Sequence, residues 1–222
     1  MFLCVQGCNY TPQLCTGKIE VISAPDSLPK KFLSNYSSSE ILVSELISEN
    51  KRRRFGYFGL TVDYNEKDKV TIQSRVYMLH IGVISQRTAG FKININDQEK
   101  IMTNDSEIIK EEEIDELFSA YYLNNGRIPH YPDSPESAYI QIAWQDGVKL
   151  SFVRNIIVRI INSYYGLLDT ELCDLEHDEL TRLKEQFPVI LEFRRISPPK
   201  HPDVSQAAWQ SSLAIPSEDT YR

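Results

Sequence analysis

The stretch FGYFGLTVDYNEKDKVTIQSRVYMLHIGVI, residues 55–84, decides the expected fold. Both of its arms are rich in β-branched and aromatic residues, which favour strands, and the polar link at 65–68 suits a hairpin loop. After the turn SQRTAG (85–90), the segment FKINI (91–95) alternates apolar and polar residues, which is typical of a strand with one buried face. These segments predict an antiparallel meander at the centre of the domain.

Further strands are predicted on both sides of this meander. The segment GKIEVIS (17–23) has the composition of a short strand, and VILEFRRI (189–196) that of the last strand. SAYIQIAW (137–144) and VKLSFV (148–153) predict a second hairpin. The Asp-Gly pair between them supplies the positive φ angles that tight hairpin turns need.

Helices are predicted where apolar residues recur at three-four spacing. Segment 105–126 is the clearest, because it has acids in its first turns and a glycine after its end. Segment 154–165 fits a helix by its length, although its β-branched residues leave a strand open. The remaining predicted helices are 37–50 and 168–187.

Together these elements predict one α+β domain over residues 1–196. Its sheet is expected to be mainly antiparallel, with about six or seven strands flanked by three or four helices. The chain length of 222 residues suits one large domain with a self-sufficient core. Residues 197–222 form a proline-rich tail, and we expect Trp209 and Leu213 to dock it on the domain or on a second copy, giving a homo-oligomer. A solvated tail is the alternative.

Charge is distributed unevenly along the chain. The net charge of −7 argues against a protein that coats nucleic acid by bulk charge. Residues 97–116 hold nine acids and two bases, whereas Lys51–Arg54 is a compact basic run. The acidic segment and the basic run could therefore each bind a partner of opposite charge.

Four cysteines, at positions 4, 8, 15 and 173, are too few for a disulfide scaffold, so reduced thiols are expected. Metal binding by Cys4, Cys8 and Cys15, or lipidation of this group, stays open as an alternative. No apolar run is long enough for a transmembrane helix, and the N-terminus lacks the basic start of a secretory signal. The sequence therefore predicts a cytoplasmic protein.

No set of residues has the spacing of a nucleophile, its base and an orienting group. His80 and His130 are isolated histidines, and acidic neighbours disfavour a thiolate on the predicted helix that carries Cys173 and His177. A nuclease-like set could combine Asp146, Glu192 and Arg194, but an arginine stays protonated where a proton-relaying lysine is expected. We predict no catalytic residue, no metal and no cofactor, and lean toward a non-enzymatic protein.

The most economical interpretation is a recognition or regulatory protein that binds a protein partner. The alternative is single-stranded nucleic acid or another polyanion, because basic residues next to aromatic ones offer phosphate contacts and stacking together. Its residues would be Lys51, Arg52, Arg53, Arg54, Tyr57 and Phe58. A hydrolytic enzyme or nuclease is the second alternative.

Overall fold

The computed structural model describes residues 14–36, 41, 42, 44, 45, 48, 55–77, 90–103, 107–124, 126–129, 131–145, 147–168 and 172–195. Residues 41, 42, 44, 45 and 48 are helical, in agreement with the helix predicted over 37–50. The other elements, in chain order, are α1 (Thr16–Ile22), β1 (Lys30–Phe32), η1 (Leu33–Asn35), β2 (Phe55–Asp63), β3 (Lys69–Tyr77), β4 (Phe91–Ile95), β5 (Ile101–Met102), β6 (Ile108–Ile109), η2 (Glu111–Glu113), α3 (Ile114–Tyr122), η3 (Pro135–Ser137), β7 (Ile140–Trp144), α4 (Leu150–Leu168), α5 (His177–Gln186) and β8 (Leu191–Arg195).

The described strands form one eight-stranded mixed sheet in the order β1-β2-β3-β8-β7-β4-β5-β6. The pairs β1–β2, β3–β8, β8–β7 and β7–β4 are parallel, and the other three are antiparallel. The α+β class is confirmed, but the prediction of a mainly antiparallel sheet is wrong. Helices connect β4 to β7 and β7 to β8. A helical crossover returns the chain to the starting end of the sheet, so the next strand runs parallel.

The first predicted hairpin is confirmed over its described part. β2 and β3 pair antiparallel over all nine residues of each strand. The Asn65 Oδ1 accepts hydrogen bonds from the backbone N–H groups of Lys67 and Asp68 at 2.8 and 2.7 Å, which closes the loop. The predicted meander is wrong, however, because β4 pairs with β7 and β5 instead of continuing from β3.

The second predicted hairpin is wrong in its second arm. β7 forms as expected, and Gly147 has a φ angle of +93°, but the chain then enters α4 at Leu150. The helix also confirms the helical interpretation of segment 154–165. It is favoured because its apolar residues recur at three-four spacing and are buried together. These residues are Val153, Ile156, Ile157, Ile160, Ile161 and Tyr164.

The strand predicted over 17–23 is wrong as well, because this segment forms α1. Gly17 approaches Leu172 so closely that a Cβ atom would lie 1.9 Å from the Leu172 carbonyl oxygen. The Tyr165 hydroxyl donates a hydrogen bond to the carbonyl of Lys18 at 3.0 Å. Contacts with residues about 150 positions away therefore hold α1, and local sequence preference does not reveal them.

Two predicted helices are shorter than expected. The helix predicted over 105–126 begins only at Ile114, because Ile108 and Ile109 form a strand with β5. Its buried stripe is confirmed, with Ile114, Phe118, Tyr121 and Tyr122 buried and Leu117 partly buried. The helix predicted over 168–187 is confirmed only as α5, so Cys173 precedes it and does not share a helical face with His177.

A disulfide joins Cys15, just before α1, to Cys173, between α4 and α5. The prediction of reduced thiols is therefore wrong for these two residues. Folding places their Cα atoms 5.6 Å apart although they lie 158 positions apart in the sequence. Cys15 is thereby also removed from the hypothetical metal site, whose other members, Cys4 and Cys8, lie outside the described residues.

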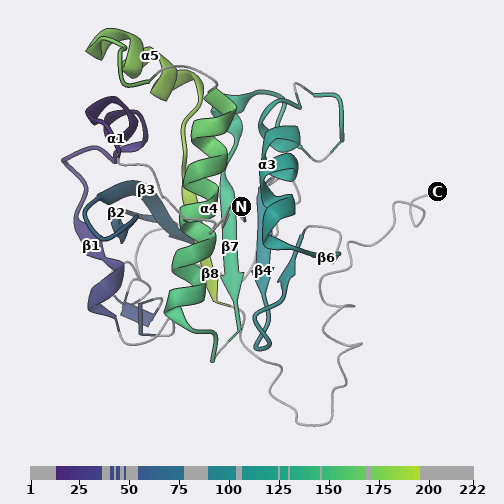
Figure 1. The fold of residues 1–222 in the computed structure, drawn as a ribbon. Coiled ribbons are helices and arrows are strands. Elements are labelled where there is room, and N and C mark those ends of the chain that lie inside the picture. Colours follow the sequence, from purple (N-terminus) through teal and green to yellow (C-terminus); the bar gives the residue numbers. More distant parts are fainter. Residues whose placement is uncertain are drawn as a thin grey trace, which may run out of the picture.

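Helices α3 and α4 lie side by side over one face of the sheet (Figure 1). The apolar side chains of the central strands point toward them, and Phe91 of β4 packs edge-on against Phe118 of α3. On the same face, the rings of Trp144 and Phe193 are 5.6 Å apart. No helix in the described part of the chain is long and apolar enough to cross a membrane. The tail 197–222 lies outside the described residues.

Removing the Cys15–Cys173 disulfide is expected to destabilise the fold. A cross-link over 158 positions limits the unfolded chain, which stabilises the folded state by about 5 kcal/mol in the chain-entropy model and by about 2–4 kcal/mol in typical measurements. We expect the Cys15→Ser/Cys173→Ser variant to lose about 2–5 kcal/mol in the free energy of unfolding, measured by urea denaturation. The Cys4→Ser/Cys8→Ser variant is the matched control, since it keeps the disulfide. Equal stability of both variants and the oxidised wild type would contradict this assignment.

Candidate functional site

β6 is the outer strand of the described sheet, and a groove of about 320 Å³ runs beside it. The groove lies between the β5–β6 hairpin and the first turn of α4. Its lining residues include four apolar residues and two lysines, namely Ile101, Ile108, Ile109, Phe152, Lys100 and Lys110. We call this surface the edge groove.

The edge groove combines an accessible apolar side chain with an open strand edge. Ile108 is 61% exposed, whereas Ile101 and Ile109 are buried. An outer strand presents backbone N–H and C=O groups on its free side, where another strand can pair with it. At the opposite edge of the sheet, the Lys31 ammonium of β1 binds the Glu45 carboxylate of the helical segment at 2.7 Å. β6 is the outer strand that has the edge groove beside it.

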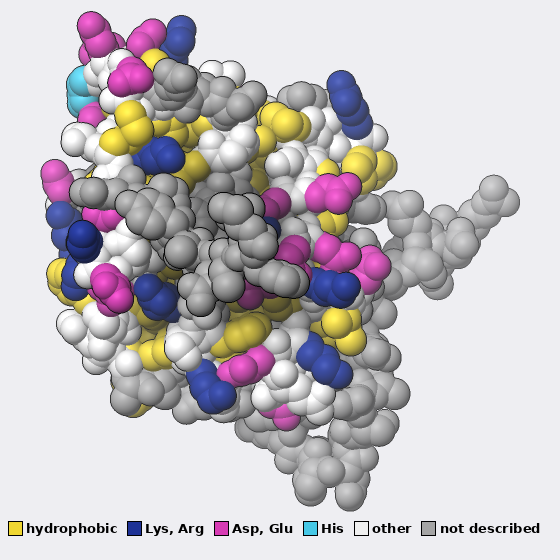
Figure 2. Space-filling model, in the orientation of Figure 1, with side chains coloured by type: hydrophobic (Ala, Val, Ile, Leu, Met, Phe, Trp, Pro, Cys, Tyr) yellow, Lys and Arg dark blue, Asp and Glu magenta, His cyan; other side chains and the backbone are white. Residues whose placement is uncertain are grey.

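Charges of both signs surround the edge groove. Lys100 and Lys110 are exposed, and Glu99 and Glu111 also line the groove. Glu99 forms an ion pair with Lys149 at 3.6 Å. Acidic side chains also gather on the flank that carries α3 and β6 (Figure 2). The groove thus has an apolar floor, a partly basic rim and acidic surroundings.

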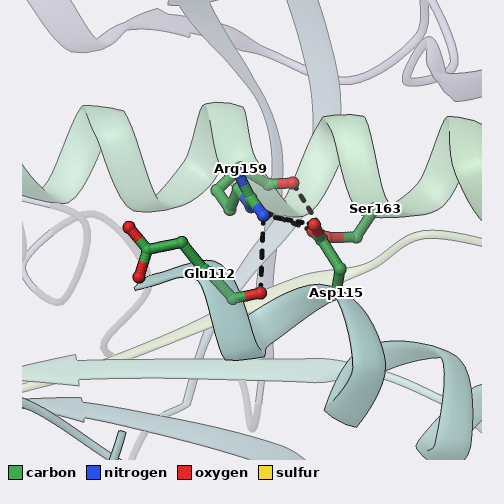
Figure 3. A network of polar contacts seen from close by, with 4 residues as sticks. All are labelled: Glu112, Asp115, Arg159 and Ser163. Carbon is green, nitrogen blue, oxygen red and sulfur yellow. Dashed lines mark hydrogen bonds and ion pairs between the residues drawn. The ribbon is translucent and has the colours of Figure 1, made fainter. Parts of the chain in front are cut away.

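A polar network holds η2 and the start of α3 against α4 (Figure 3). The Asp115 carboxylate accepts hydrogen bonds from the Arg159 Nε at 2.9 Å and from the Ser163 hydroxyl at 2.5 Å. The Arg159 Nη2 contacts the same carboxylate and donates to the Glu112 carbonyl at 3.4 Å. Because η2 begins two residues after β6, this network also positions the edge groove.

The other face of the sheet carries a row of polar side chains, one from each of five neighbouring strands. The strand registers align Tyr57, Arg75, Glu192, Gln141 and Lys92, and we call them the polar row. The Arg75 Nε and Nη2 both donate to the Glu192 Oε2, at 2.8 and 2.7 Å. Their side chains are only 14% and 2% exposed. Gln141 is buried too, and its Oε1 has no hydrogen-bond partner among the described residues.

Tyr139 stacks on the polar row. The Arg75 guanidinium lies 4.5 Å from the centre of the Tyr139 ring. A side chain at Gly90 would collide with this ring, since a Cβ atom there would lie 2.6 Å from it. The Tyr121 hydroxyl donates to the Tyr139 carbonyl at 3.2 Å. Burial raises the pKa of the Tyr121 hydroxyl well above its ordinary value, so this group stays protonated as the donor.

The residues of the predicted polyanion site differ in their placement. Tyr57 is 40% exposed on the face of the polar row. Phe58 is 2% exposed on the opposite face, where it packs against Phe193, and it offers no stacking surface. Lys51–Arg54 lie outside the described residues.

The other candidates named from the sequence are scattered. Glu192 is in the polar row, whereas Asp146 and the side chain of Arg194 lie outside the described part of the chain. His177 contacts Glu20 of α1, which gives it a structural partner. Positions outside the described residues include His80, His130, Trp209 and Leu213. No group of three or more metal-binding side chains comes together in the described ranges.

Sequence reasoning missed both the edge groove and the polar row. The signal for the first was the apolar pair Ile108–Ile109, which was assigned to a predicted helix because acidic residues surround it. The polar row had a weaker signal, since a polar residue in each strand is usual for a sheet with one solvated face. Only the registers place Arg75, Glu192 and Gln141 side by side.

Replacing only one partner of the buried Arg75–Glu192 ion pair is expected to lower the free energy of unfolding strongly. Replacing Glu192 with leucine leaves a largely buried guanidinium without this carboxylate, and such a loss typically costs about 3–5 kcal/mol. The Arg75→Met/Glu192→Leu variant should recover most of that loss in urea denaturation. The control is Asp63→Ala, which breaks the exposed Lys69–Asp63 pair and should cost less than about 1 kcal/mol. An equal effect of Glu192→Leu and Asp63→Ala would refute the buried pair.

Comparison with known proteins gives no further guide to this site. No protein-family model, no curated protein and no solved structure matches the chain. The function must therefore be argued from the edge groove and the polar row themselves.

Proposed function

We propose that this chain is a recognition protein that binds an extended segment of a partner protein along β6. The partner segment pairs with the free edge of β6 and places an apolar side chain in the edge groove. The observation that carries the proposal is Ile108, which is 61% exposed on an outer strand beside an apolar groove.

Strand addition suits this geometry for two reasons. Main-chain hydrogen bonds to an outer strand supply affinity, while pockets for alternate side chains supply specificity. The described part of β6 is short, with two residues, so the groove must supply much of the binding energy. Burial of one aliphatic side chain is worth about 1.5–3 kcal/mol, which fits a transient complex more than an obligate one.

The charges around the groove favour a partner segment that carries basic residues beside its apolar ones. Glu107, Glu112, Glu113 and Glu116 are exposed on or near β6 and the start of α3. A basic residue flanking the bound segment would be attracted by these carboxylates, chiefly through the association rate and at low salt.

The polyanion alternative stays a prediction with reduced support. Of its two aromatic residues, only Tyr57 has an exposed ring in the structure. We do not propose hydrolysis, because Glu192 is buried and ion-paired with Arg75 and does not line the edge groove. Oligomer formation through the tail also stays a prediction.

The location of the protein bears on the choice of partner. A cytoplasmic location, expected from the sequence, stays a prediction. The Cys15–Cys173 disulfide supports a compartment that is oxidising enough to keep it, since structural disulfides are rare in the cytosol. The partner would have to meet the protein in that same compartment.

Selection from a random peptide library on the immobilised full-length chain tests this function. We expect enriched peptides with alternating apolar residues and flanking lysine or arginine. The Ile108→Glu variant should bind them about tenfold to a hundredfold more weakly in calorimetry, because it removes one apolar contact.

A matched control is Ile128→Glu, since Ile128 is 49% exposed but lies outside the edge groove. This variant should bind the selected peptides like the wild type. Equal binding to all three proteins, or the absence of any enriched pattern, would overturn the proposed function.

A further inference from the structure

The chain itself carries a segment with two features expected of an edge-groove ligand, a backbone without proline and alternating apolar side chains. Residues 203–215, DVSQAAWQSSLAI, are free of proline, between Pro202 and Pro216. Every one of their backbone N–H groups can therefore pair with a strand edge. In an extended conformation, Trp209, Leu213 and Ile215 would share one face, while from position 206 on the other face would carry alanine, glutamine and serine.

The strand registers place the start of the tail in line with the edge groove. Arg195, Trp144, Ile95, Ile101 and Ile109 form one continuous row across β8, β7, β4, β5 and β6. Neighbouring strands are about 4.8 Å apart, so the row from β8 to β6 spans roughly 19 Å. β8 and β4 also run in the same direction, toward the end of the sheet where the β4–β5 turn lies (Figure 1).

The linker is long enough to make this connection. Residues 196–203 separate Arg195 from the apolar part of the tail, and they include Pro198, Pro199 and Pro202. A polyproline-like segment spans about 3.1 Å per residue, so these residues reach about 25 Å. This reach exceeds the span to β6, so the tail can extend to the groove, and its covalent attachment raises its effective concentration there.

The chemistry of the groove suits an indole. Its floor is apolar, through Ile101, Ile109 and Phe152, and exposed Lys100 and Lys110 line the groove. An indole ring buries a large apolar area and is the best aromatic partner for an ammonium group. Ile108 is a further lining residue of the groove, on the outer strand.

We propose that residues 203–215 bind the edge groove of their own chain, with Trp209 in the groove, and thereby compete with the partner segment. The competition rests on the proposed function, whereas the docking of the tail does not. The tail then acts as an intramolecular competitor that lowers the apparent affinity of the groove for the partner. A partner must bind the free groove tightly enough to displace it.

Fluorescence of the full-length chain tests the docking. Trp144 is buried, so the difference between the wild type and Trp209→Phe reports the emission of Trp209. We expect a blue-shifted Trp209 emission that acrylamide quenches poorly. Ile108→Glu should shift it to the emission of free indole and raise its quenching severalfold, while Ile128→Glu should leave it unchanged. Emission like that of free indole in the wild type would overturn the proposal.

Photo-crosslinking distinguishes docking within one chain from exchange between two copies. A benzophenone amino acid at position 213 should label the peptide that contains Ile108, in a product with the mass of the monomer. Labelling in a product with the mass of a dimer would show that a second copy provides the tail, and would overturn docking within the chain. Labelling elsewhere, or none, would overturn the edge groove as the site.

Peptide binding then tests the competition. Trp209→Ala/Leu213→Ala in the full-length chain should bind a selected peptide about tenfold more tightly, as expected if the tail occupies the groove about 90% of the time. Unchanged affinity would overturn the competition. If no peptide binds either protein while Trp209 stays protected from acrylamide, the proposed function fails and the docking of the tail stands.

Discussion

The burial of the apolar stripe of α4 against the central strands is the interaction on which the rest of the fold depends. Every residue of this stripe is fully buried, and it packs on the face that carries Phe193 of β8 and Trp144 of β7. The same helix lies on the connection from β7 to β8, which makes these two strands parallel neighbours. One helix thus supplies both the core and the strand order, so its loss would remove both.

The edge groove is a consequence of how far that helical layer extends. α3 and α4 cover the central strands, and the Asp115–Arg159 contact ties the two helices together (Figure 3). The short strands β5 and β6 extend the sheet beyond β4, and Phe152 in the first turn of α4 lines the groove beside them. Ile109 lies in the row of Ile101, Ile95 and Trp144 on the helical face, whereas Ile108, the next residue of the outer strand, points to the opposite face and is exposed.

The two faces of the sheet differ in what keeps their side chains in place. On the helical face, the free energy of apolar burial has no preferred direction and is roughly proportional to the buried area. In the polar row, Arg75 and Glu192 must meet in one geometry, and Gly90 must leave room for the Tyr139 ring. A buried ion pair adds little net stability over apolar residues of similar size. We therefore interpret the polar row as a feature that selects the register of β3, β8 and β7.

The sequence by itself determined those elements whose partners are close along the chain. The β2–β3 hairpin, the buried stripe of α3 and the helix at 154–165 follow from turn residues and apolar spacing, which act over a few positions. Only the tertiary structure decided that segment 17–23 is a helix, that β4 joins β7, and that Cys15 meets Cys173. The edge groove and the polar row belong to this second group. The edge groove needs Phe152 of α4 beside the β5–β6 hairpin, and the polar row is made by strand neighbours far apart in the sequence. Period-two patterns specify which face a side chain occupies but not which element lies beside it.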